Sequence, residues 1–98
     1  MHKPTDAELE RLAMLAEECG EVVQMVGKII LHGYKSYHPN DPSTPNRILL
    51  SEEVGDIEAV LSMMRENNDI PLLPSRDILA KKERKMKYAH YQEKRDGT

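Results

Sequence analysis

Tryptophan and phenylalanine are absent from the sequence, and its only aromatic residues are four tyrosines. The core must therefore come from leucine, isoleucine, valine, alanine and methionine, a composition typical of packed helices. No stretch has the alternating apolar pattern of a half-buried strand, and there is no internal repeat or low-complexity tract. These absences argue against a sheet and favour an all-α fold.

Cysteine is nearly absent as well. Cys19 is the single cysteine, so no disulfide can form within the chain. The sequence shows no signal peptide and no long uncharged apolar run, so we expect a cytoplasmic protein without a membrane segment. The net charge of −3 predicts no general affinity for nucleic acid or for acidic membranes.

Three helices are expected along the 98 residues, which allow only a modest core. Thr5 and Glu8 are spaced as a capping box, so the first helix should cover residues 6–32. A second helix is expected over about 45–68 and a third over about 75–94.

Residues 33–46 contain three prolines and no apolar periodicity, so they should form a loop. The loop is long for a small domain, which favours an ordered or functional surface loop over a passive connector. Tyr34 and Tyr37 in this loop, and Tyr88 and Tyr91 near the C-terminus, could each stack on a base. Helical packing explains Tyr88 and Tyr91 equally well.

Apolar residues cover well over half the circumference of the first helix. The first stripe consists of Leu9, Leu12, Ala16, Cys19, Val23, Val26 and Ile30. The second stripe consists of Met14, Leu15, Val22, Met25 and Ile29. Two short neighbouring helices cannot cover so wide a face, so we expect a homo-oligomer, a dimer or a tetramer. The alternative is a monomeric three-helix bundle.

Four acidic residues lie on helix faces that should be buried. Glu18 and Glu21, three apart, fall within the second stripe, while Glu53 and Asp56, also three apart, lie on the apolar side of the second helix. Like-charged pairs brought together repel unless a cation compensates them. The spacing predicts a four-carboxylate site for a hard cation, Mg²⁺ or Mn²⁺. The alternatives are salt bridges to lysines of the third helix, or positions at the rim of the core with the carboxylates in water.

The third helix carries a basic run that consists of Lys81, Lys82, Arg84, Lys85 and Lys87. These residues are either a solvated face or ligands for phosphate oxygens near the acidic site. No G-x-x-x-x-G-K-[ST] loop is present, so metal and lysine would have to hold any phosphate. No Ser-His-Asp or Cys-His arrangement can be argued, and the histidines are too scattered to predict a ligand cluster.

At these residues the sequence resembles the MazG-like nucleotide pyrophosphohydrolases, members of the all-α NTP pyrophosphatase superfamily. The motifs are E-E-x-x-E at residues 17–21 and E-x-x-D at residues 53–56. The segments H-G-Y-K-S-Y-H-P-N-D-P at 32–42, N-R at 46–47 and K-x-x-K-x-K-Y-x-H at 82–90 are similar to the small phage and prophage type. The resemblance therefore covers nearly the whole chain.

The resemblance implies a single MazG-like domain over residues 1–98, with a bundle-like all-α NTP pyrophosphatase fold completed by oligomerisation. It also implies Mg²⁺-dependent hydrolysis of a nucleoside triphosphate to a monophosphate and pyrophosphate. One alternative is a hydrolase of another nucleotide, such as an alarmone. Another is a catalytically silent interaction module whose acids bind a cation only to stabilise the oligomer.

The resemblance also assigns roles to individual residues. The residues that match the metal ligands are Glu18, Glu21, Glu53 and Asp56. Glu17 matches an accessory acid that helps to orient water or a further metal. The candidates for binding the phosphates or other parts of the substrate are Lys82, Lys85, Asn46 and Arg47.

Overall fold

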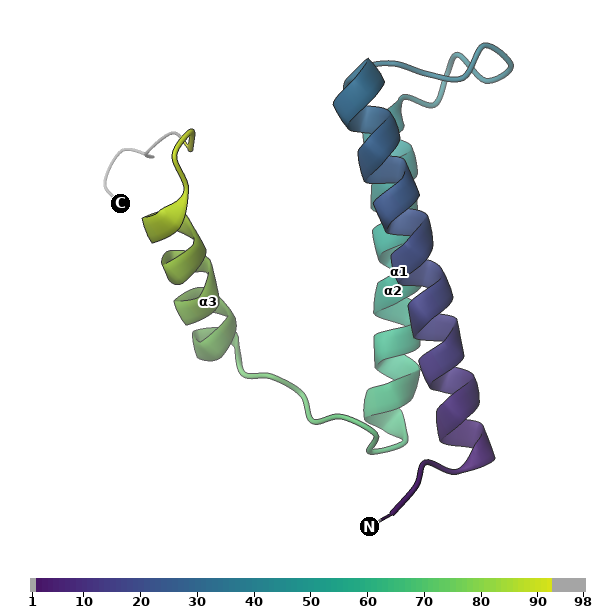
Figure 1. The fold of residues 1–98 in the computed structure, drawn as a ribbon, viewed down its shortest axis with the longest axis vertical. Helices are drawn as coiled ribbons and strands as arrows, with labels where there is room; N and C mark the ends of the chain where they lie inside the picture. The colour runs from purple at the N-terminus through teal and green to yellow at the C-terminus, as the bar shows by residue number, and fades with distance from the viewer. Residues whose placement is uncertain (1, 93–98) are drawn as a thin grey trace.

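The computed structural model describes residues 2–92, which form three α-helices (Figure 1). α1 spans Asp6–His32, α2 spans Asn46–Glu66 and α3 spans Ser75–Tyr88. Within this part of the chain no strand forms, and only Tyr37 and Pro45 pair in an isolated bridge. The predicted all-α fold is confirmed.

The boundaries of α1 follow directly from the sequence. The Glu8 N–H donates to Thr5 Oγ1 at 3.2 Å and the Thr5 N–H donates to Glu8 Oε1 at 2.8 Å, which is a capping box. At the other end, the Gly33 N–H donates to the Ile29 carbonyl at 2.7 Å. Gly33 has a φ of 90°, which glycine adopts without strain. Both predicted ends of this helix are confirmed.

α2 ends two residues earlier than predicted, at Glu66. Asn67 Nδ2 donates to the Met63 carbonyl at 2.8 Å, which satisfies one of the carbonyls left free at the helix end. Asn68 follows with a φ of 60°, in the left-handed region that asparagine tolerates. The Asn67 side-chain contact and the left-handed backbone of Asn68 together end the helix.

α3 ends at Tyr88, whereas the sequence predicted a helix to about residue 94. The prediction is wrong for residues 89–92, and residues 93 and 94 lie outside the described part. Ala89 has extended backbone, with φ −80° and ψ 147°. Within residues 2–92 α3 packs against neither α1 nor α2. An isolated helix has only its own propensity to stabilise its last turns, and like charges four residues apart oppose it.

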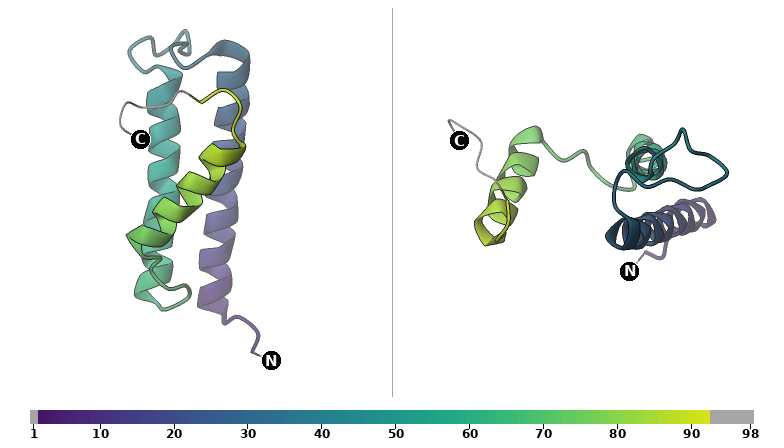
Figure 2. Two further views of the ribbon diagram at one scale, coloured as in Figure 1. Left: turned by 90° about the vertical axis from the view of Figure 1, so that its left-hand side faces the viewer. Right: turned by 90° about the horizontal axis from the view of Figure 1, so that it is seen from above.

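α1 and α2 form an antiparallel pair, and the views in Figure 2 show them side by side. The face of α1 that packs on α2 is the second stripe. The fully buried apolar side chains of the described residues are Met25, Val60 and Met64. This helix pair therefore contains the core, and it also positions the acidic residues.

Each end of the helix pair is tied by polar contacts. At the loop end, the Asn46 N–H donates to the Ser36 carbonyl at 2.7 Å and Asn46 Nδ2 donates to the Gly33 carbonyl at 3.1 Å. At the opposite end, Arg11 and Asp69 form a two-contact ion pair at 2.6 and 2.9 Å. Their side chains are only 14% and 8% exposed, so water competes little for this pair.

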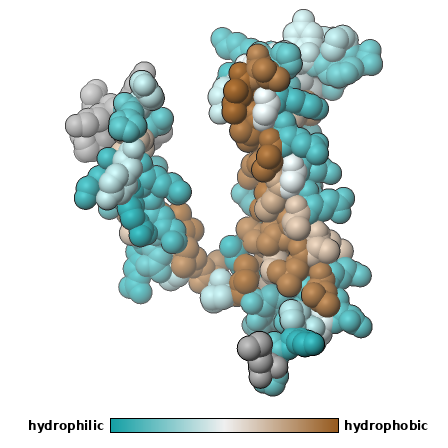
Figure 3. Space-filling model, viewed as in Figure 1, coloured by the Kyte–Doolittle hydropathy of each residue, from teal (hydrophilic) through white to brown (hydrophobic). Residues whose placement is uncertain are grey.

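Much apolar surface stays uncovered in the single chain. The first stripe of α1 faces away from α2, with Val23 70% and Ile30 79% exposed, and Figure 3 shows part of the uncovered surface. The radius of gyration is 17.2 Å, against about 13 Å for a compact domain of this length. Residues 2–92 of the single chain therefore do not form a three-helix bundle. Among residues 2–92, no helix has the length and apolarity needed to cross a membrane.

Truncation of the core should reveal how strongly the helix pair depends on it. Met64 is 3% exposed and its neighbour Met63 is 39% exposed. Met64→Ala should lower the free energy of unfolding by roughly 2–5 kcal/mol, because it leaves a cavity between the two helices. Met63→Ala is the matched control and should cost clearly less. Urea unfolding followed by circular dichroism measures both, and equal losses would contradict this description of the core.

Candidate metal site between the first two helices

Glu18 lies at a position of α1 where the helix faces α2. It follows Met14 by one turn and precedes Val22 by one turn, so the three side chains share the face of the second stripe. Glu18 is half-buried. The same periodicity that makes the core therefore brings a carboxylate into the helix interface.

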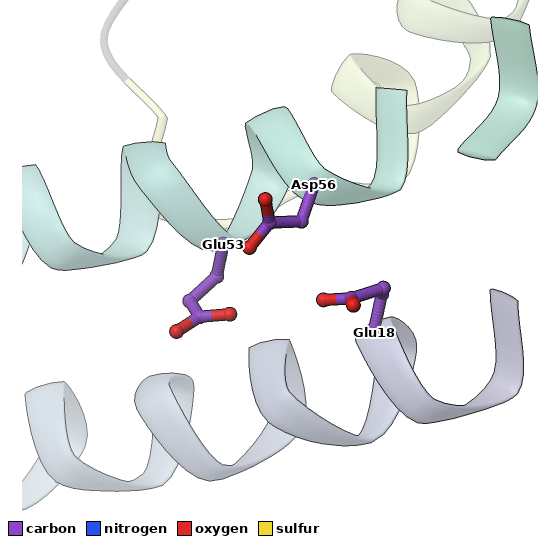
Figure 4. Close-up of side chains that lie close together, drawn as sticks. All are labelled: Glu18, Glu53 and Asp56. Atoms are coloured by element: carbon purple, nitrogen blue, oxygen red, sulfur yellow. The ribbon is translucent and has the colours of Figure 1, made fainter. Parts of the chain in front are cut away.

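Glu53 and Asp56 approach Glu18 from α2, as Figure 4 shows. Each of these three residues offers a carboxylate oxygen, and the three oxygens lie within 4.8 Å of one another. Oxygens on opposite sides of a Mg²⁺ ion are roughly 4.2 Å apart, twice the usual Mg–O distance. The spacing therefore has the scale of a divalent cation site.

Two oxygens of this cluster lack any hydrogen-bond partner. Glu18 Oε2 and Glu53 Oε2 are buried and accept no hydrogen bond. A buried carboxylate oxygen without a partner is costly unless a cation or a proton neutralises it. The ion pairs found among residues 2–92 join Arg11 to Asp69 and Arg76 to Asp77, so no salt bridge neutralises the cluster. The residues present fit a hard cation, which carboxylate oxygens prefer as ligands.

The crowding also shifts proton affinities. Burial is the main cause that raises the pKa of Glu18, and the charges of Asp56, Glu21 and Glu17 raise it further. The pKa of Glu53 is raised first by a hydrogen bond with the Glu21 carboxyl, then by burial and by neighbouring charges. The cluster therefore holds protons more tightly than ordinary glutamates do.

The four predicted metal ligands are placed close together, although not equally. Glu18, Glu53 and Asp56 form the three-oxygen cluster. Glu21 lies about one turn further along α1, is exposed and is not part of this cluster, but it raises the pKa values of both Glu53 and Glu18. Glu17 is exposed and acts on Glu18 through its charge.

The predicted substrate-binding residues lie elsewhere. Lys82 and Lys85 are on α3, which within residues 2–92 contacts neither helix of the pair. Asn46 is buried at the start of α2, where its side chain closes the loop onto Gly33. The Arg47 guanidinium lies over the Tyr34 ring, 5.7 Å from its centroid.

Sequence reasoning missed two features of the helix pair. The Arg11–Asp69 pair joins residues 58 positions apart, and no spacing rule connects them. The second feature is a hollow at the loop end, where Lys28, His32 and His38 come together. The loop composition contained a signal for this hollow. A loop that joins two antiparallel helices, closed by Gly33 and Asn46, must bring the end of α1 next to the start of α2.

In comparisons with known proteins, no family model, no curated protein and no solved structure matches this chain. The class that the fold and site define is therefore an all-α protein with an acidic cluster between two helices. The resemblance to the MazG-like pyrophosphohydrolases stays a prediction.

Acid and Mg²⁺ should both stabilise the metal-free protein. The pKa values of Glu18 and Glu53 are raised in the fold, so the folded state binds more protons than the unfolded chain. Stability should therefore rise as the pH falls from neutral towards 4.5, the ordinary glutamate pKa. Asp69, whose pKa is lowered, loses its stabilising effect only below its ordinary value of 3.8. At neutral pH, millimolar Mg²⁺ should raise the melting temperature by mass action.

Two variants isolate the cluster in the same thermal melts. Glu53→Gln removes one charge with little change in shape, so it should raise the neutral-pH melting temperature without metal and reduce both responses. Glu58→Gln, on the exposed side of α2, is the matched control and should keep both responses. A wild-type melting temperature that falls on mild acidification and ignores Mg²⁺ would rule out the site.

Proposed function

We propose that this chain is a Mg²⁺-dependent nucleotide pyrophosphohydrolase that converts a (d)NTP and water into a (d)NMP and pyrophosphate. The observation that carries the proposal is the pair of buried, unpartnered oxygens of Glu18 and Glu53 with Asp56 close by. The E-E-x-x-E and E-x-x-D motifs support the same reaction class.

Glu18, Glu53 and Asp56 would hold the cation, with Glu21 beside Glu53 as a fourth acid. When bound, Mg²⁺ or Mn²⁺ supplies positive charge that polarises phosphate oxygens and lowers the pKa of a coordinated water. Glu21 and Glu17 are exposed next to the cluster, so their carboxylates can accept hydrogen bonds from an attacking water and orient it. The chain's own contribution is thus mainly electrostatic and positional.

Basic residues of α3 would bind the phosphates of the substrate. Lys82 follows Ile78 by four residues and precedes Met86 by four, so a lysine sits within the apolar side of this helix. Ile78 and Met86 are exposed, at 56% and 43%. If that side docks on an acidic surface, Lys82 and its neighbour Lys85 go with it.

We propose that a second copy of the chain completes the arrangement, in a homodimer or a tetramer. α3 carries six basic and two acidic residues, while α1 carries six acidic and two basic ones. α2 carries five acidic and two basic residues. This charge complementarity favours contact between α3 of one copy and the helix pair of another. The first stripe of α1 supplies apolar surface for the same assembly.

The main rival is the interaction module that hydrolyses nothing, and the exposed first stripe is the observation that favours it. Hydrolysis of another nucleotide, such as an alarmone, is the second rival. Turnover separates an enzyme from a module, whereas metal binding alone does not.

A (d)NTP panel with Mg²⁺ tests the reaction, scored by release of monophosphate and pyrophosphate. Wild type should hydrolyse at least one nucleotide, and chelation of the metal should abolish turnover. Glu53→Gln should lower kcat/KM by about tenfold or more, because it weakens the hold on the metal. Glu58→Gln should match wild type. Absence of turnover with every nucleotide would leave the interaction module as the better interpretation.

Light scattering at micromolar concentration tests the assembly. Wild type should be a dimer or larger. Val23→Glu places a charge in the centre of the first stripe and should shift the protein towards monomer, since a charge is costly to bury. Gln24→Glu, the adjacent residue on the polar side of α1, should leave the mass unchanged. A monodisperse wild-type monomer would contradict the proposed assembly.

A further inference from the structure

A hollow of about 350 Å³ lies at the loop end of the helix pair. This volume is within the range of roughly 300–1,000 Å³ found for small-molecule sites. The lining residues that matter for its chemistry are Lys28, His32, Tyr37, His38, Asn46 and Leu49. None of the residues that line it is acidic, in contrast to the carboxylate cluster.

The hollow and the carboxylates share one face of the helix pair. On α1, Lys28 follows Glu21 by seven residues, two turns along the same side of the helix. On α2, Leu49 precedes Glu53 by four residues, and Glu53 precedes Asp56 by three. At about 1.5 Å per residue these steps correspond to roughly 4.5–10.5 Å along the helix axes. One small molecule can therefore reach both places.

The lining suits a flat, polar ring. Tyr37 provides an aromatic ring and Leu49 an apolar side chain, surfaces on which a base can stack. The Asn40 N–H donates to His38 Nδ1 at 3.1 Å, so neutral His38 carries its proton on Nε2. That N–H and the Lys28 ammonium can donate to the carbonyl oxygens of a base or to a sugar hydroxyl.

The loop that forms one wall of the hollow is held in place. Tyr37 pairs with Pro45 in the isolated bridge, and the Asn46 N–H donates to the Ser36 carbonyl next to Tyr37. The Asn46 side chain fixes Gly33 at the other side of the loop. The site is therefore largely formed without a ligand, which reduces the entropy that binding must overcome.

We propose that this hollow binds the nucleoside part of the nucleotide whose phosphates lie at the carboxylate cluster. The inference rests on the proposed function for the phosphate end, but the hollow can be tested separately. Tyr37 stacks on the base, and His38 and Lys28 contact its polar edge or the sugar. A competing possibility, an anion held by Lys28 alone, is one outcome of the test.

The experiment is a calorimetric titration of the full chain with the four deoxynucleoside monophosphates, and with pyrophosphate, all in the presence of Mg²⁺. Wild type is compared with Tyr37→Leu and with Tyr34→Leu. Tyr34 is a tyrosine of the same loop whose ring stacks on Arg47. Tyr37→Leu should weaken binding of at least one monophosphate about tenfold and change pyrophosphate binding less than twofold. Tyr34→Leu should bind monophosphates as wild type does.

A second measurement needs no substitution. In wild type, a monophosphate that binds in the calorimetric titration should shift the NMR resonances of the His32 and His38 imidazole rings. Pyrophosphate should leave these resonances unchanged. Equal shifts with pyrophosphate would indicate an anion site and overturn the proposal. Equal affinities of Tyr37→Leu and Tyr34→Leu, or no monophosphate binding at millimolar concentration, would overturn it as well.

These measurements also test the proposed nucleoside site separately from the proposed hydrolysis. If Tyr37→Leu changes neither kcat nor KM of nucleotide hydrolysis, the proposed nucleoside site is wrong and the proposed hydrolysis still stands. Monophosphate binding that depends on Tyr37, without any turnover, would support a nucleoside site and remove the proposed hydrolysis.

Discussion

The structure depends on one conflict, the placement of carboxylates inside a helix interface that apolar side chains create. Glu18 and Glu53 lie within the faces that join α1 to α2, and one oxygen of each is buried without a partner. The helices cannot pack through these faces without bringing the acids together. The raised pKa values of both residues are the direct sign of that conflict. A proton or a divalent cation resolves it, which links the stability of the fold to the chemistry of the site.

Helix periodicity explains why much of this site could be predicted. Glu18 and Glu53 each fall on an apolar face, and period 3.6 alone determines that both reach the same interface. Glu21 shows the limit of the rule. Three residues correspond to 300° rather than a full turn, so its side chain lies to one side of Glu18 and meets Glu53 at the rim. The capping box at Thr5 was predictable for a similar reason, because its contacts are local.

Features that depend on distant parts of the chain could not be predicted. His32 and His38 looked scattered, yet closure of the loop by Asn46 brings both to one hollow. α3 ends at Tyr88, earlier than its sequence predicts, because helix propensity alone does not hold the last turns of a helix that has no packing partner within residues 2–92. The helical spacing of apolar residues did predict excess apolar surface on α1, and the exposed first stripe agrees with that prediction.

The two fastened ends of the helix pair have a mechanical consequence for the acids between them. Arg11 and Asp69 clamp one end, and Asn46 with Gly33 clamps the other. These contacts oppose separation of α1 and α2 near both ends, and Glu18 and Glu53 lie between them. We therefore expect the width of the gap between Glu18 and Glu53 to depend partly on residues outside the cluster. If the cluster binds a cation as proposed, an ion that fits the gap would find its ligands already in position, whereas a larger ion would have to push the two helices apart. Residues near the two ends of the helices would in that case contribute to discrimination between cations of equal charge.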